Sequence, residues 1–174
     1  AQAMASEAKT LLKGFSISET DSIGRQSFLP YQRTEDAPLF DHDLLAPASH
    51  PEMLGRIGRY EVERCIGAGG MGIVFKAFDT ELNRPVAIKV LASHLARNGA
   101  ARQRFSRESK AAASVAHENV VAIHNVDSEN KYPYLVMQFV QGESLQARVD
   151  REGPLSPERL LQIGLQSALG LAAA

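Results

Sequence analysis

The sequence is poor in cysteine and aromatic residues, and it contains no tryptophan. Its one cysteine, Cys65, excludes an internal disulfide and a thiolate metal cluster, and we interpret it as a buried apolar residue of a strand. The five histidines show no metal-ligand spacing, so we expect no metal site among these residues. These features fit a protein of a reducing cytoplasm.

Long apolar runs and a charge excess are also missing. No run reaches the roughly 18–20 apolar residues that a membrane span needs, and the start lacks the pattern of a signal peptide. The formal net charge is -1, and 44% of the 174 residues are hydrophobic, which is typical of a globular domain with a core. We therefore expect a cytoplasmic protein with no membrane segment and no nucleic-acid partner.

Residues 1–57 differ in composition from the rest. They are acidic, with 8 acidic and 5 basic residues up to Gly58, and four prolines in this segment argue against long helices and central strands. We predict an acidic N-terminal extension or linker that is largely irregular. Residues 6–15 are suited to two helical turns, and the run "APLFDHDLL" of residues 37–45 is suited to pin the segment to a neighbouring surface.

From residue 59 the hydrophobic pattern becomes regular. Strand-like runs cover residues 59–67, 72–79, 84–92, 119–126 and 133–140, and helix formers at helical spacing cover residues 99–116. A second helix is predicted to begin after Ser156 as N-cap, with Pro157 at its first position. Consecutive strands with short turns favour an antiparallel sheet in an α+β fold.

The stretch "IGAGGMGIVFKAFD", residues 66–79, contains the pattern G-x-G-x-x-G at Gly67, Gly69 and Gly72. A dinucleotide-binding loop needs a helix after the glycines, whereas β-branched and aromatic residues follow here and favour a strand. A Walker A loop needs Gly-Lys-Ser/Thr, which is missing. We therefore predict a glycine-rich hairpin whose backbone amides lie over phosphates; a plain flexible hairpin remains the alternative.

Lys89 ends the apolar run "VAIK" and shares its strand face with Ala87. A lysine in so apolar a strand is costly unless its ammonium group meets an anion. A surface lysine whose stem lies along apolar neighbours is the alternative. The glycine loop one hairpin upstream favours the anion.

The predicted helix offers a carboxylate as the partner of Lys89. Glu108 lies on one helical stripe with Phe105, Ala112 and Val115, so we predict that it faces inward, where an acid needs a cation. The alternative is a surface i,i+4 pair of Glu108 with Arg104, which would take Glu108 off the stripe.

Together these motifs resemble the N-terminal lobe of protein kinases, specifically the bacterial eukaryotic-like Ser/Thr kinases. The resemblance includes the loop of residues 66–74, "VAIK" ending at Lys89, and Glu108 on the helix that the family calls αC. It extends through "HENVV" from His117 and "YLVMQFVQGESL" from Tyr134. The resemblance implies a kinase-like lobe with a five-stranded antiparallel sheet and the αC helix. It divides a partial kinase domain, residues 58–174, into an N-lobe (59–140), a hinge (138–142) and the start of the C-lobe (143–174).

The resemblance also implies roles for individual residues. Lys89 would contact the α- and β-phosphates of ATP, and Glu108 would orient it. Met137 matches the gatekeeper, the backbones of Gln138 and Val140 would read the adenine edge, and Ser144 falls near the ribose. The remaining nucleotide-binding residues form the loop and the roof over adenine: Ile66, Gly67, Ala68, Gly69, Gly70, Met71, Gly72, Ile73, Val74 and Ala87.

The family's catalytic loop, H-R-D-x-x-x-x-N, and its D-F-G metal site are not in this sequence. We therefore expect a piece of a longer protein, with the general base and the Mg²⁺ ligands beyond residue 174. The full-length protein would transfer the γ-phosphate of ATP to Ser or Thr of a protein substrate, while these 174 residues alone would be inactive. The alternative is a pseudokinase, a nucleotide-binding scaffold module.

Overall fold

A computed structural model describes residues 43–174 of the protein. A six-stranded antiparallel sheet forms its centre, with the strand order β1-β2-β3-β4-β6-β5. The strands are β1 (Gly55–Ile57), β2 (Tyr60–Gly69), β3 (Gly72–Asp79), β4 (Arg84–Leu91), β5 (Ile123–Asp127) and β6 (Tyr134–Gln138). The predicted α+β class and antiparallel pairing are confirmed.

The sheet has one strand more than the five that we predicted. β1 pairs with β2 from Gly55↔Val62 to Ile57↔Tyr60, and Gly58, at φ 57°, makes the tight turn between them. Three residues carry too little alternation to be recognised as a strand in the sequence. The domain boundary before residue 58 remains a prediction, but the sheet includes residues on its N-terminal side.

The core lies on one face of the sheet. Phe75, Ile88 and Val136 are opposite one another on β3, β4 and β6, and each is fully buried. Their alternate neighbours point to the other face, because successive side chains of a strand alternate. That second face carries the residues of the candidate site.

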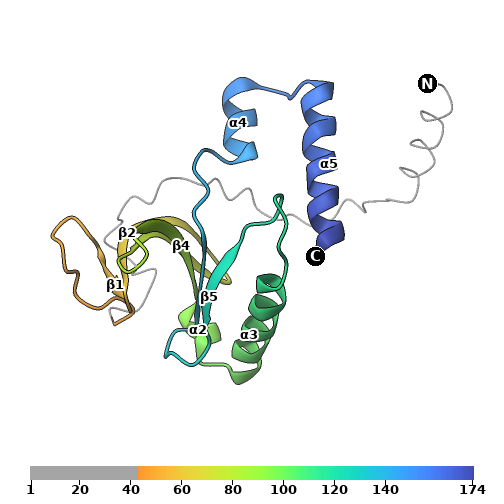
Figure 1. Ribbon diagram of the computed structural model, residues 1–174. Coiled ribbons are helices and arrows are strands. Elements are labelled where there is room, and N and C mark those ends of the chain that lie inside the picture. The colour runs from red at the N-terminus through yellow and green to blue at the C-terminus, as the bar shows by residue number, and fades with distance from the viewer. Residues whose placement is uncertain (1–42) are drawn as a thin grey trace.

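Residues 43–174 contain four helices, which arise from local signals of differing strength. They are α2 (Ser93–Ala96), α3 (Gly99–Ala113), α4 (Leu145–Glu152) and α5 (Pro157–Ala173). The predicted N-cap of α5 is confirmed, since the Ser156 hydroxyl accepts a hydrogen bond from the Arg159 amide. Figure 1 shows α3 beside β5, with α4 and α5 beyond the end of the sheet. In the described part of the chain, no helix combines the length and the apolar character of a membrane span.

The residues before β1 lie against the sheet. We call residues 43–54 the strap. Leu44 and Leu45 pack against the core, and Ala46 exchanges two backbone hydrogen bonds with Arg56 of β1, at 2.9 and 2.8 Å. The predicted pinning run ends in this segment, although residues 37–42 and the predicted helix at 6–15 lie outside the described residues.

Candidate functional site

The glycine-rich segment is a β-hairpin, as predicted. β2 and β3 pair up to Gly69↔Gly72, and Gly70 and Met71 form the tip. A strand rather than a helix follows Gly72, which excludes a dinucleotide-binding loop. Ile66 falls at a β-bulge, because Cys65 pairs with Phe75 and Gly67 with Val74.

The glycines of the hairpin differ in whether a side chain would fit at their positions. A Cβ on Gly72 would lie 2.0 Å from the Val90 carbonyl oxygen, so the fold itself requires glycine there. At Gly69 and Gly70 a Cβ would meet nothing within 4 Å. Packing therefore explains Gly72 but not Gly69 or Gly70, where the absence of a side chain leaves open space beside the backbone.

Cys65 lies in β2, the first strand of the hairpin, as predicted, but it is half-buried rather than buried. Its thiol donates to the Gly67 carbonyl oxygen at 3.4 Å. Burial raises the pKa of the Cys65 thiol, so the thiolate is disfavoured, in keeping with a packing role.

Strand register gathers most of the predicted roof and gatekeeper residues on the second face of the sheet. Val74 is opposite Lys89, and Ala87 is opposite Met137. Directly opposed residues of antiparallel strands share a face, so these four side chains lie together. Ile73 points the other way into the core, so only its backbone is available to a nucleotide.

Glu108 does not meet Lys89 in this structure. Its carboxylate accepts a hydrogen bond from the Arg104 guanidinium at 2.8 Å, the i,i+4 pair that was the alternative interpretation, and its side chain is 58% exposed. No ion pair of Lys89 occurs among residues 43–174. The prediction that Glu108 faces inward and pairs with Lys89 is thus wrong for this conformation.

The two groups nevertheless lie within electrostatic reach of each other. The hydrogen bond from Arg104 holds the pKa of Glu108 below its ordinary value, and the positive charges of Arg107 and Lys89 lower it further. The Lys89 charge therefore already acts on the Glu108 carboxylate, although Arg104 is its hydrogen-bond partner.

At the predicted hinge, the backbone N–H of Gln138 already donates to the Ala122 carbonyl oxygen at 2.8 Å. Any backbone contact of Gln138 with an adenine edge must therefore be made by its backbone carbonyl oxygen. Val140, the other predicted hinge residue, is 61% exposed. Ser144 has a local role that we did not predict: its hydroxyl accepts from the Ala147 amide at 3.1 Å and caps α4.

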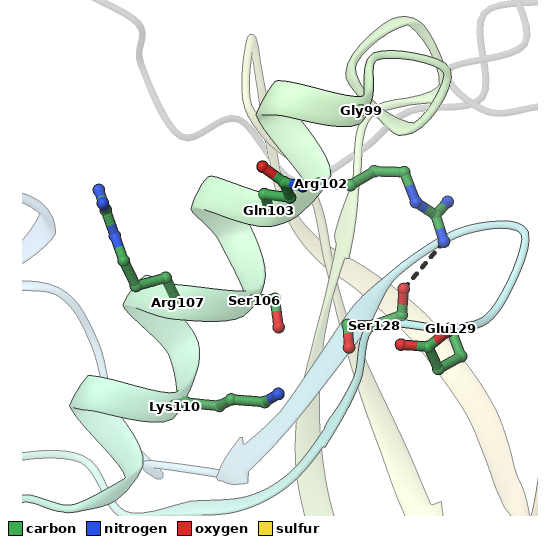
Figure 2. Close-up of a pocket in the computed structure, with 8 residues that line it drawn as sticks. All are labelled: Gly99, Arg102, Gln103, Ser106, Arg107, Lys110, Ser128 and Glu129. Atoms are coloured by element: carbon green, nitrogen blue, oxygen red, sulfur yellow. Dashed lines mark hydrogen bonds between the residues drawn. The ribbon is translucent and has the colours of Figure 1, made fainter.

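A hollow of about 630 Å³ lies elsewhere, between α3 and the β5–β6 turn. It contains no residue of the hairpin, β4 or hinge. Figure 2 shows the Arg102 guanidinium reaching across to Ser128 in the turn, while Arg107 points away from it. Nothing in the sequence pattern distinguished Arg102 from the other basic residues of this helix. The lining residues are Gly99, Arg102, Gln103, Ser106, Arg107, Lys110, Ser128 and Glu129.

Comparison with known proteins agrees with this geometry. Residues 60–173 match the protein kinase domain family. The chain is 41% identical over 106 residues to the serine/threonine-protein kinase PrkC of Bacillus subtilis, covering 61% of this chain and 16% of PrkC. It is 38% identical over 109 residues to PknB of Mycobacterium tuberculosis, covering 60% of this chain and 17% of PknB.

Among solved structures, the kinase domain of M. tuberculosis PknI aligns with a TM-score of 0.57 and 27% identity, over 74% of this chain and 51% of that domain. The chain therefore spans about half of a solved kinase domain and less than a fifth of these two full-length relatives. With the match over residues 60–173, the chain belongs to the protein kinase domain family.

Proposed function

We propose that this chain is the ATP-binding portion of a protein serine/threonine kinase. One observation carries the proposal. Strand register brings Val74, Ala87, Lys89 and Met137 onto one face, beside a hairpin whose Gly69 and Gly70 leave open space. An apolar surface, one cation and bare amides are complementary to a purine that carries phosphates.

Each group has a distinct part in binding. Val74, Ala87 and Met137 offer apolar contact to the adenine ring, while the amides near Gly69 and Gly70 and the Lys89 ammonium face the phosphate charge. Glu108, once it leaves Arg104, would orient Lys89. Mg²⁺, when bound, neutralises phosphate charge; we expect its protein ligands outside residues 1–174.

The first test is Lys89→Met, with ATP affinity of the chain measured by calorimetry. We expect an affinity at least about tenfold weaker, because a charge-assisted contact to phosphate is lost, with the fold retained. Lys76→Met is the matched control, since Lys76 lies on the same face but pairs with Glu63 at 2.6 Å. Equal loss in both variants would contradict the assignment of Lys89.

The full-length protein separates a kinase from the pseudokinase alternative. We expect autophosphorylation on Ser or Thr by the wild type and its near-complete loss in Lys89→Met. A full-length wild type that binds ATP but transfers no phosphate to itself or to a generic protein substrate would favour the pseudokinase.

A further inference from the structure

We propose that the strap, residues 43–54, positions α3 through the β5–β6 turn, with Asp43 and Arg102 as the two positioning residues. The strap precedes the residues that match the kinase family, which begin at residue 60. The turn, residues 128–133, is held from both sides: by the strap on one side and by α3 on the other.

The strap holds the turn through Asp43. One carboxylate oxygen accepts a hydrogen bond from the Tyr132 hydroxyl at 2.7 Å, and the other pairs with the Lys131 ammonium group. The Lys131 ammonium also lies 5.1 Å from the centre of the Tyr132 ring. Because Leu44 and Leu45 follow directly and pack against the core, Asp43 is held at a defined place beside the turn.

The anchoring of the strap continues into the sheet. The Ser49 amide approaches the carboxylate of buried Glu61 at 3.3 Å, and a Cβ on Gly55 would lie 2.7 Å from that of Leu45. The close approach at Gly55 means that strap and β1 fit together only because that residue is glycine. The strap is therefore an integral layer of the lobe rather than a loose lead-in.

Helix α3 holds the same turn through Arg102. Its guanidinium donates to the carbonyl oxygens of Ser128 and Asn130, both at 2.8 Å, and of Lys131 at 3.0 Å; Figure 2 shows the first of these bonds. It also donates to the carbonyl of Ala96 at 3.3 Å. The Lys131 side chain therefore pairs with Asp43, and its carbonyl oxygen accepts a hydrogen bond from Arg102, so that one residue links the strap to the helix.

This link adds to the packing of α3 against β5 and α2, in which few side chains of the helix are buried. Only Ser109 of the helix is buried, and Phe105 is partly buried against the core. Glu108 follows Arg102 by six residues, about 9 Å along the helix axis at 1.5 Å per residue. A loosened turn therefore loosens the helix that carries Glu108. The consequence for ATP affinity rests on the proposed function.

The test measures hydrogen exchange of the chain and, separately, its ATP affinity, at a temperature well below unfolding. In Asp43→Ala we expect amide exchange about three- to fivefold faster in residues 128–133 and in α3, with ATP affinity about twofold weaker. Arg102→Gln should speed exchange of the same amides, and in the double variant the combined effect on exchange should be smaller than the sum of the two single effects. Asp43→Glu should restore part of the protection. Glu52→Gln in the strap and Lys110→Gln on α3, both exposed, are the charge-matched controls.

Two outcomes overturn the proposal. One is faster exchange confined to the strap itself, with the turn and α3 unchanged; the other is strictly additive effects of Asp43→Ala and Arg102→Gln on α3. A wild-type chain that fails to bind ATP, yet shows the expected exchange pattern, would refute the proposed function and leave the positioning role supported.

Discussion

Strand β4 and helix α3 each contribute one residue of the proposed Lys89–Glu108 pair, and the fold holds them in different ways. β4 lies between β3 and β6, so backbone hydrogen bonds hold it on both sides, and Ile88 next to Lys89 is fully buried. α3 buries only Ser109, and its Glu108 side chain is 58% exposed. The position of Lys89 is thus set by the sheet, whereas that of Glu108 depends on a few side-chain contacts.

This difference shows where the proposed site can change. A central strand cannot shift without breaking its ladder, whereas a helix with few buried side chains can move at lower cost. In the present structure Glu108 is bound to Arg104. The pairing that the proposed function requires is therefore decided by α3 and its supports.

The largest effect should come from emptying the sheet's core. Phe75→Ala removes a fully buried ring, so we expect a loss of about 3–5 kcal/mol in the free energy of unfolding, measured by urea denaturation. Phe105→Ala on α3 is the comparison and should cost less than half as much, since that ring is only partly buried. Equal losses would mean that helix and sheet are held alike.

The hairpin offers the next largest effect. Gly72→Ala places a methyl group 2.0 Å from a carbonyl oxygen at a φ of 152°, so we expect a loss of about 1–3 kcal/mol in stability. Gly70→Ala meets open space and should leave the urea midpoint nearly unchanged. If the two variants unfold alike, the distinction between fold-required and ligand-facing glycines is wrong.

A smaller effect should follow from releasing Glu108. Arg104→Ala removes its present partner, so the carboxylate becomes free to approach Lys89, and we expect ATP affinity to rise about twofold. Arg107→Ala serves as control, because Arg107 influences Glu108 only through its charge. Unchanged or weaker affinity in Arg104→Ala would show that this pair does not compete with Lys89.

The smallest effect concerns acid pH. Hydrogen bonds from Lys131 and Tyr132 lower the pKa of Asp43 from its ordinary value of 3.8. The contribution of the Asp43 carboxylate to stability is therefore fully present above pH 3.8 and is lost as the pH falls through the lowered pKa. We expect the Asp43 carboxyl signal to titrate below pH 3.8 by NMR. Tyr132→Phe should move the titration upward; no movement would argue against the hydrogen bond.

Much of the sheet could be predicted from the sequence, because each strand has its own alternation and each turn its own residues. The hairpin at Gly69–Gly72, the strand that carries Lys89 and the N-cap at Ser156 were all recognisable from local patterns. β1 was missed since three residues show no period. Ser144 was assigned to the ribose, although the serine before a helical run is also the ordinary N-cap signal.

The inward face of α3 was harder to predict. Phe105, Ala112 and Val115 suggested a stripe that includes Glu108, but Ala112 is exposed and Ser109 is the buried residue. Alanine gains little from burial and therefore orients a helix only weakly. Neither the Arg104 pairing nor the Arg102 contacts with the turn leave a trace in the hydrophobic pattern.

By itself, the sequence determined five of the six strands, the hairpin and the family to which the chain belongs, because these depend on side-chain alternation and on backbone freedom at neighbouring residues. Only the tertiary structure decided between Arg104 and Lys89 as the partner of Glu108, placed Arg102 at the β5–β6 turn, and brought Asp43 to Lys131 across 88 positions of sequence. These contacts depend on how separate elements pack against one another, and local sequence patterns carry no information about that packing.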